Sequence, residues 1–180
     1  MQKNIKVNYC KLLRDPAEFE QVIRSAVSLI PPCIIQDNNA DTYTSDGYFN
    51  EVKNTDIPIS KYKNLKEFTP SITVPLIRFL AEIYPGCSIT TTGHFLYPIT
   101  GYMSWHTNSD TIGKRVYVTY VDQVNKSGFK YFNGTEIVNS VDTDEITVRA
   151  FDIEKENTLS HSVYSNCNRY SFGFRVVSLR

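Results

Sequence analysis

Apolar residues recur at intervals of three and four across residues 16–29, which predicts an amphipathic helix with one buried face. Asp15 stands where an N-cap belongs, with Pro16 at the first helical position and Glu18 three residues after the cap. A following pair of prolines ends the pattern, because proline has no N–H to continue the helical hydrogen bonds. We interpret this helix as a scaffold element packed on a sheet.

A second helical pattern covers residues 74–84 and ends at a Pro-Gly pair. Beyond it, apolar and polar residues alternate as on half-buried strands, and an Asn-Gly pair at 133–134 favours a tight type I′ hairpin turn. The predicted strands are residues 4–13, 88–96, 115–122, 128–132, 135–138, 146–153, 159–164 and 169–179. This order favours an α+β architecture, and the pattern alone leaves sandwich, barrel and jelly roll open.

Residues 34–68 show no regular pattern. They are polar and turn-rich, with aromatic side chains at Tyr43, Tyr48 and Phe49. A long irregular segment in a compact domain is usually either a functional loop or a disordered one. Two interpretations therefore stay open, a flap over a binding site and a mobile surface loop.

The composition narrows the class of protein. Charged residues make up 21% of the chain and balance at 19 basic and 19 acidic, without a long basic run, so a nucleic-acid backbone is not expected as a partner. The four cysteines form no CxxC pair, which argues against a zinc site or a disulfide framework and favours reduced thiols. No signal peptide or membrane-spanning run is visible. We expect a cytoplasmic protein that does not bind membranes.

The candidate chemistry lies in the second half of the chain. His106 is followed two residues later by Asn108, and a second histidine, His161, lies 55 residues further on. Arg169 and Ser171 follow His161 as an Arg-x-Ser pair. This order resembles the Fe(II)- and 2-oxoglutarate-dependent oxygenases, which have His-x-Asp/Glu, a distant His and then Arg-x-Ser. The resemblance covers residues 93–177, about half of the chain, and departs from the family at Asn108, where the family has a carboxylate.

The resemblance implies a fold, a domain and an activity. The fold would be a distorted jelly roll, the double-stranded β-helix, with two supporting helices in the N-terminal half. Residues 1–180 would form one oxygenase-like domain, with helical support and a flap in 1–85 and the jelly-roll core in 86–180. The activity would be hydroxylation of an unactivated C–H bond in a small-molecule or peptide substrate, with Fe(II) as the metal and 2-oxoglutarate as co-substrate.

The expected metal ligands are His106, Asn108 and His161. A non-haem iron site needs three ligands on one face, and neutral imidazole suits iron. Residues i and i+2 of a strand point to the same side, so His106 and Asn108 could grip one ion. Asp110 is the alternative carboxylate, about 13 Å from His106 on an extended strand unless a turn shortens the path. His94 has no motif around it and is read as a structural or lining residue.

The expected co-substrate ligands are Arg169, Ser171 and Tyr97. The guanidinium fork of arginine matches a carboxylate, and Arg169 and Ser171 share one face of their strand. Tyr97 lies nine residues before His106, similar to a tyrosine of the prolyl-hydroxylase-type branch that donates its hydroxyl to the co-substrate. Arg175 is a less favoured carboxylate partner. The residues that flank the metal ligand, Tyr102 and Trp105, are candidates for lining the substrate pocket, as is Asp110.

Two other classes of function remain beside the enzyme. Because Asn108 replaces the carboxylate, the chain could be a non-catalytic module of the same fold that binds 2-oxoglutarate or another ligand. It could also be a structural or interaction protein in which the motif is fortuitous. Iron content and 2-oxoglutarate turnover separate the enzyme from both.

Overall fold

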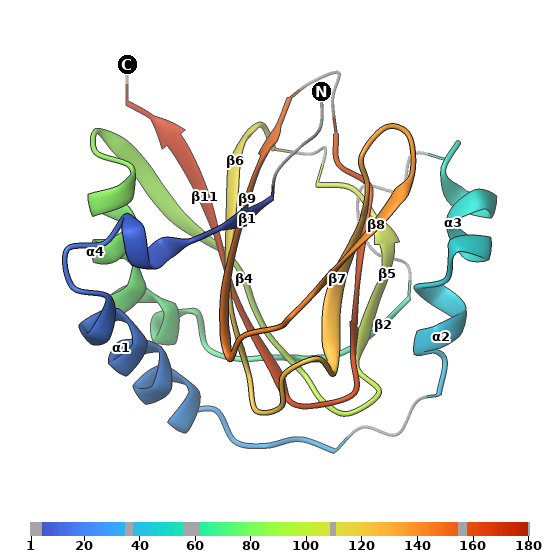
Figure 1. Cartoon of the computed structure of the whole chain (residues 1–180), viewed down its shortest axis with the longest axis horizontal. Helices are drawn as coiled ribbons and strands as arrows, with labels where there is room; N and C mark the ends of the chain where they lie inside the picture. The colour runs from blue at the N-terminus through green and yellow to red at the C-terminus, as the bar shows by residue number, and fades with distance from the viewer. Residues whose placement is uncertain (1–4, 35–37, 56–61, 109–110, 155–157, 180) are drawn as a thin grey trace.

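The computed structural model describes residues 5–34, 38–55, 62–108, 111–154 and 158–179. In this part of the chain, two antiparallel β-sheets face each other and helices cover their outer faces (Figure 1). The large sheet has the order β1-β9-β6-β11-β4-β3, with bounds Lys6–Val7, Ile146–Ile153, Gly113–Val121, Arg169–Ser178, Cys87–Tyr97 and Lys66–Glu67. The small sheet has the order β2-β5-β10-β7-β8, with bounds Lys63–Asn64, Tyr102–His106, His161–Ser165, Ser127–Phe132 and Ile137–Val141.

The central strand β11 shows how alternation separates the two faces of the large sheet. Tyr170, Phe172 and Phe174 are buried on the outer face, in the hydrophobic core beneath the helices. The intervening Arg169 and Ser171 point the other way and line a cavity between the sheets. One strand therefore contributes to the main core and to the polar interior at once.

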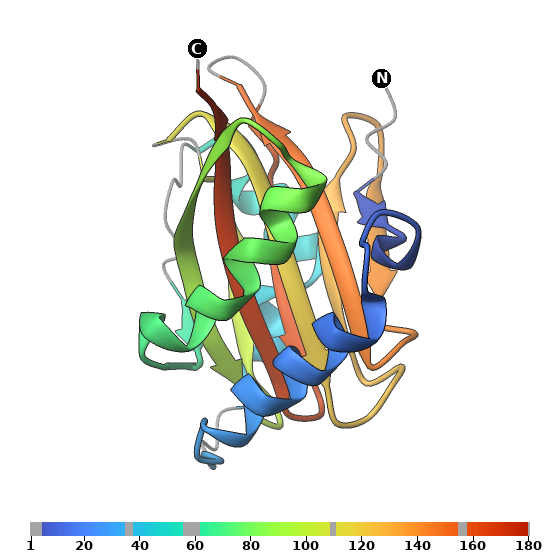
Figure 2. The same cartoon turned by 90° about the vertical axis from the view of Figure 1, so that its left-hand side faces the viewer.

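Two helices cover the outer face of the large sheet (Figure 2). They are α1 (Pro16–Ser28) and α4 (Val74–Ile83), the latter preceded by the 3₁₀ turn η2 (Pro70–Thr73). Asp15 caps α1 as predicted, because its Oδ1 accepts a hydrogen bond from the Glu18 N–H at 2.9 Å. The rings of Phe19 and Phe79 meet edge to face at 5.2 Å and join the two helices above the sheet.

The described part of residues 34–68 is more ordered than the sequence predicted. It contains two short helices, α2 (Ala40–Tyr43) and α3 (Asp46–Val52). Ser45 caps α3, since its Oγ accepts a hydrogen bond from the Tyr48 N–H at 3.0 Å. Residues 35–37 and 56–61 of this segment lie outside the described part of the chain.

These helices pack on the outer face of the small sheet (Figure 1), and a flap role for this segment stays a prediction. Phe49 of α3 packs on Trp105 of β5 with ring centroids 4.5 Å apart. Tyr43 stacks on Tyr62 at 4.1 Å. The aromatic residues of this polar segment thus pack together and against the sheet, and Phe49 is buried there, a tertiary contact that outweighs the turn-rich composition.

The N-terminal strand and the turn between β7 and β8 differ from the prediction. The N-terminal strand is short, because β1 gives way to the 3₁₀ turn η1 (Tyr9–Lys11). The hairpin between β7 and β8 forms where expected but is not a type I′ turn, because Phe132 pairs with Ile137 and leaves a four-residue loop. Asn133 stabilises this loop because its Oδ1 accepts hydrogen bonds from the N–H groups of Thr135 and Glu136, both at 2.9 Å.

Among the described helices, none has the length and apolar character needed to cross a membrane.

Candidate functional site

A cavity of about 180 Å³ opens between the two sheets. It brings together six of the predicted site residues. They come from the His-x-Asn stretch, from the segment with His161 and the Arg-x-Ser pair, and from β4. None of its described lining residues is acidic. The lining residues are Lys63, Thr92, Gly93, Phe95, Tyr97, Met103, His106, Asn108, Tyr117, Phe129, His161, Val163, Arg169 and Ser171.

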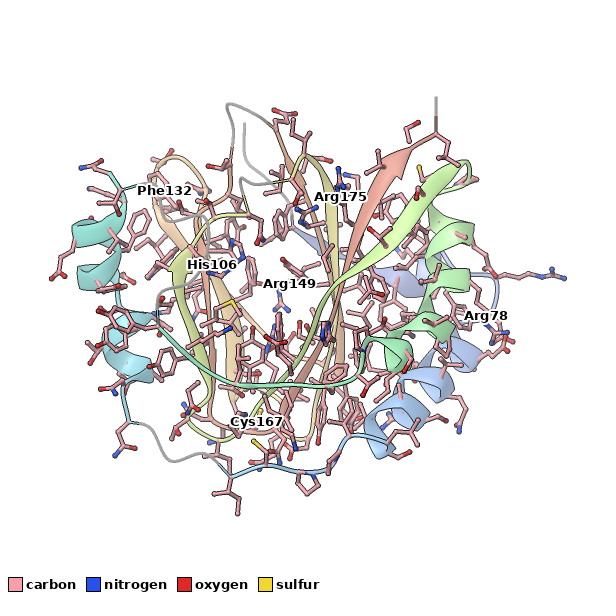
Figure 3. All side chains as sticks on the ribbon, turned by 180° about the vertical axis from the view of Figure 1, so that it is seen from behind. Arg78, His106, Phe132, Arg149, Cys167 and Arg175 are labelled. Atoms are coloured by element: carbon pink, nitrogen blue, oxygen red, sulfur yellow. The ribbon has the colours of Figure 1, made fainter. Side chains whose placement is uncertain are left out.

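The two histidines meet because β5 ends where β10 begins. His106 and His161 pair directly across the antiparallel strands, and their ring centroids lie 4.1 Å apart. Phe129 of the neighbouring strand β7 stacks on His161 at 4.9 Å and fixes the plane of that ring. Both imidazoles are almost fully buried, so the cavity holds two nitrogen ligands at adjacent positions (Figure 3 shows His106 between the sheets).

Backbone carbonyls fix the tautomer of each imidazole. His106 Nδ1 lies 2.8 Å from the carbonyl oxygen of Ser104, and His161 Nδ1 lies 2.9 Å from that of Leu159. A carbonyl oxygen only accepts hydrogen bonds, so each Nδ1 carries the proton and each Nε2 of the neutral rings carries a lone pair. This is the arrangement in which a histidine binds a metal through Nε2.

Burial keeps both rings neutral. It lowers the pKa of His106 to about 4, although the hydrogen bond to Ser104 opposes the shift. Burial and then the neighbouring His106 hold the pKa of His161 well below its ordinary value. Neutral imidazoles can coordinate a cation without first losing a proton.

The pH dependence of stability should show this burial. Between pH about 6.5 and about 4 the unfolded chain binds protons at His106 and His161 that the folded metal-free protein does not, so the free energy of unfolding should fall as the pH falls. The shift at His106 alone corresponds to about 3 kcal/mol. Urea unfolding from pH 7 to pH 4 measures it, with His106→Gln as the control that flattens the profile. Equal slopes in both proteins would contradict the neutral buried assignment.

Asn108 lies just beyond the end of β5, so strand parity is not what brings it to the cavity. Its Nδ2 donates to the Tyr117 hydroxyl at 3.0 Å and lies 3.4 Å from His161 Nε2. The Tyr117 ring fits there because Gly173 has no side chain; a Cβ at that position would lie 2.9 Å from Tyr117 Cε1. The amide amino group thus faces the histidine lone pair, and a half-turn of the amide would present Oδ1 instead.

This donor set fits a transition metal with two nitrogen ligands and one neutral oxygen ligand. Two Nε2 lone pairs directed to one cavity could hold a cation, and imidazole suits Fe(II) and related ions. Among the described residues, no three His, Cys, Asp or Glu side chains lie close enough together to hold a metal ion by themselves. The alternative ligand Asp110 lies outside the described residues.

The predicted carboxylate clamp is buried and already partly engaged. Arg169 Nε donates to Asp142 Oδ2 at 3.0 Å, and Nη2 donates to the Thr119 hydroxyl at 3.2 Å. The remaining nitrogen, Nη1, is buried and has no hydrogen-bond partner among the described residues. Tyr97 lies beneath the guanidinium, with its ring centroid 5.3 Å from Cζ, and Ser171 lines the same cavity. Arg169 was predicted to bind a carboxylate with two nitrogens, but mainly Nη1 remains for a ligand.

Tyr97 retains its proton. Burial raises the pKa of its hydroxyl, and Arg169 only partly opposes this shift. The hydroxyl is therefore a hydrogen-bond donor at neutral pH, as the predicted role requires.

Two residues predicted to line the substrate pocket lie outside the cavity. Tyr102 stacks with Tyr43, and Trp105 donates its indole N–H to the Ser45 carbonyl oxygen at 3.0 Å, both on the outer face of the small sheet. The register shift in β5 places His106 on the inner face and leaves its neighbour Trp105 outside. His94 stacks on Phe95 and is not among the lining residues.

Among the residues that the sequence reasoning missed are Asp142 and Arg149 behind the cavity and Tyr117 in its lining. Asp142 lies in a polar turn, where nothing distinguishes it from a surface residue. Arg149 lies between the apolar residues Val148 and Ala150 of β9, and a charge with apolar neighbours was the available signal for a buried ion pair. Tyr117 follows the inward parity of β6 but looked like one of many sheet aromatics.

Comparisons with known proteins add structural neighbours only. No protein-family model and no curated protein matches the sequence. Among solved structures, a prolyl hydroxylase from Trichoplax adhaerens in complex with a hypoxia inducible factor peptide fragment matches with TM-score 0.48 and 13% identity, over 93% of this chain and 81% of that one. A Pseudomonas putida prolyl-4-hydroxylase matches with TM-score 0.44 and 12% identity, over 97% and 89%. Similarity at this level carries no argument about the reaction.

Proposed function

We propose that this protein is a metal- and 2-oxoglutarate-dependent oxygenase that hydroxylates an unactivated C–H bond of a small molecule or peptide. One observation supports it most. A single cavity holds the two Nε2 lone pairs of His106 and His161 together with the unpaired Nη1 of buried Arg169. A cation site and an anion site in one enclosed space suit a chelating keto acid with a distal carboxylate.

The metal would be held by His106 and His161, with Asn108 as the third ligand through Oδ1. When bound, Fe(II) supplies the oxygen chemistry that couples decarboxylation of 2-oxoglutarate to hydroxylation of the substrate. The described residues prepare for this by holding both imidazoles neutral and correctly oriented.

The remaining lining residues bind the co-substrate and strengthen its electrostatic contacts. Arg169 Nη1, the Tyr97 hydroxyl and the Ser171 hydroxyl are the donors proposed for the distal carboxylate. Apolar side chains of Phe129 and Val163 form part of the wall near the histidines. Apolar walls of this kind lower the local dielectric constant and so strengthen the electrostatic contacts beside them.

The two facing antiparallel sheets are consistent with a jelly roll, and we infer that it is the double-stranded β-helix of the oxygenases. In this proposal residues 1–180 form one domain, whose core is 86–180 and whose support lies in 1–85.

A second function is favoured by the orientation of Asn108. Its amino group, not its oxygen, faces His161 Nε2 at 3.4 Å and satisfies that lone pair without a metal. A site in which His161 is satisfied in this way could bind a carboxylate ligand at Arg169 and perform no oxidation. The alternative is then a non-catalytic ligand-binding module.

Replacing Asn108 by Asp should separate the two functions. An anionic oxygen attracts a divalent cation more strongly than an amide oxygen at the same distance, so Mn(II) affinity should rise by about tenfold or more. Calorimetric titration with Mn(II) measures this, and consumption of 2-oxoglutarate with Fe(II) should rise in parallel. The exposed Asn139→Asp variant adds the same charge outside the cavity and should leave both values unchanged. Unchanged metal affinity in the Asn108→Asp variant would favour the non-catalytic module.

A further inference from the structure

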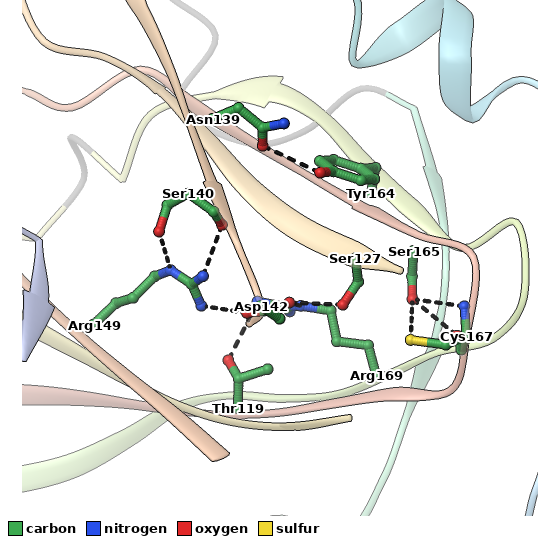
Figure 4. Close-up of polar contacts among 10 residues, drawn as sticks. All are labelled: Thr119, Ser127, Asn139, Ser140, Asp142, Arg149, Tyr164, Ser165, Cys167 and Arg169. Atoms are coloured by element: carbon green, nitrogen blue, oxygen red, sulfur yellow. Dashed lines mark hydrogen bonds and ion pairs between the residues drawn. The ribbon is translucent and has the colours of Figure 1, made fainter. Parts of the chain in front are cut away.

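A buried cluster of two arginines and one aspartate adjoins the cavity (Figure 4). Arg149, Asp142 and Arg169 come from three separate parts of the chain, and their side chains are between 0% and 2% exposed. Three charged groups removed from water in this way need a strong compensating interaction. Only the charges and hydrogen-bond donors that are not satisfied within the cluster remain for a ligand.

Arg149 has no nitrogen left to donate to a ligand. Its Nη1 donates to Asp142 Oδ1 at 2.7 Å, its Nε to the Ser140 hydroxyl at 3.1 Å, and its Nη2 to the Ser140 carbonyl oxygen at 2.7 Å. Every nitrogen of this guanidinium is engaged inside the protein, and Arg149 does not line the cavity. Its role is to hold Asp142.

Asp142 is fixed from several directions and is ionised. Besides the two arginines, the Ser127 hydroxyl donates to its Oδ2 at 2.7 Å, and its own N–H donates to the Ser127 carbonyl oxygen at 3.0 Å. Burial alone would raise the pKa of this carboxyl, but the charges of Arg169 and Arg149 outweigh it and hold the pKa at about 2. One carboxylate therefore neutralises one of two guanidinium charges, which leaves the cluster with a net charge of about +1.

Arg169 is the member that faces the cavity. Asp142 takes its Nε edge and Thr119 takes Nη2, so the guanidinium is held along one side. Both hydrogens of Nη1 lack a partner among the described residues, although the atom is buried. A buried charged donor without an acceptor is costly, and a ligand oxygen would satisfy it.

We propose that Asp142, anchored by Arg149, is a positioning residue that aims Arg169 Nη1 into the cavity, and that the cluster selects a ligand end with one negative charge. The inference deepens the proposed function, on which it rests, by stating why a carboxylate is preferred there. A carboxylate brings the summed charge of the cluster and the ligand end to zero. An amide end leaves it at about +1, and a phosphonate end with nearly two charges leaves it at about −1.

The wild-type protein provides the first test. Calorimetric titration of the Mn(II)-loaded protein at pH 8 without oxygen would compare 2-oxoglutarate with two analogues, in which the distal carboxylate is replaced by a primary amide or by a phosphonate. 2-Oxoglutarate should bind about tenfold or more tightly than either, because a hydrogen bond between charged groups has that effect on affinity. Equal affinity for the carboxylate and the amide would overturn the inference.

Two substitutions that touch no ligand provide the second test. Asp142→Asn raises the net charge of the cluster to about +2, so the ratio of phosphonate to carboxylate affinity should rise by about tenfold. Arg149→Gln lowers the net charge to about zero, so 2-oxoglutarate affinity should fall by about tenfold. Asp152→Asn is the control, since it removes an exposed carboxylate paired with Lys114 on the same strand as Arg149. A purely structural role would lower the melting temperature of both variants and leave ligand selectivity as in the wild type.

The metal-free protein separates this inference from the proposed function. Glutarate and its monoamide would be titrated against it, because neither needs a metal to reach Arg169. If 2-oxoglutarate fails to bind with Mn(II) but glutarate is preferred over its monoamide, the oxygenase proposal fails and the cluster's role stands. If 2-oxoglutarate binds without preference for a carboxylate, the cluster's role fails and the oxygenase proposal stands. Absence of all binding would overturn both.

Discussion

Replacing either His106 or His161 by alanine is expected to abolish stoichiometric Mn(II) binding while leaving the two sheets folded. Each ring supplies one Nε2 lone pair to the cavity, and no described carboxylate lines the cavity to replace it. With a neutral amide as the third ligand, one lost imidazole leaves too few donors to hold the ion. Metal content after gel filtration and circular dichroism of the same samples measure the two parts of the expectation.

The third histidine is the matched control for this experiment. His94 lies on β4, stacks on Phe95 and does not line the cavity, so His94→Ala should retain full metal content. If His106→Ala or His161→Ala retains stoichiometric metal, the assignment of the ligands is wrong.

Replacing Arg169 by alanine is expected to weaken 2-oxoglutarate binding by about 2–5 kcal/mol, the range measured when one partner of a buried charge pair is truncated. The reason is geometric as well as electrostatic. Nη1 is the buried donor that has no internal partner, so no other group of the cluster can take over its contact. Calorimetric titration with Mn(II) present gives the affinity.

Two variants separate the loss of this contact from a nonspecific effect of the substitution on the fold. Arg175→Ala removes an arginine from the same strand, whose Nε donates to the Ile112 carbonyl oxygen away from the cavity lining, and should change affinity little. Arg169→Lys keeps the charge but cannot reproduce the fork held by Asp142 and Thr119, so it should recover only part of the affinity. A larger loss in Arg175→Ala than in Arg169→Ala would transfer the clamp to Arg175.

The sequence by itself determined most of the regular elements and the candidate ligands. The helix after Asp15 follows from a cap, a proline and a three-to-four spacing that act within a few residues of one another. Strand β9 has the bounds predicted from its pattern, and β11 is one residue shorter than predicted at its C-terminal end. The motif of His106, His161 and Arg169 could also be recognised in the sequence, and the structure brings all three residues to one cavity.

The tertiary structure decided how these ligands are used. Phe49 lies in a helix of the apparently irregular segment and packs on Trp105, which the register shift in β5 leaves outside the predicted pocket. Asp142 changed the predicted clamp by taking one edge of Arg169.

The physical reason is the range of the interactions. Capping, periodicity and turn chemistry act between near neighbours in the chain, so they leave a pattern in the sequence. Arg149 and Arg169 reach Asp142 from 7 and 27 residues away, and only the closure of the two sheets removes the three groups from water and makes their charges strong. Local interactions therefore set the elements, whereas burial set the charge and the free donor of the site.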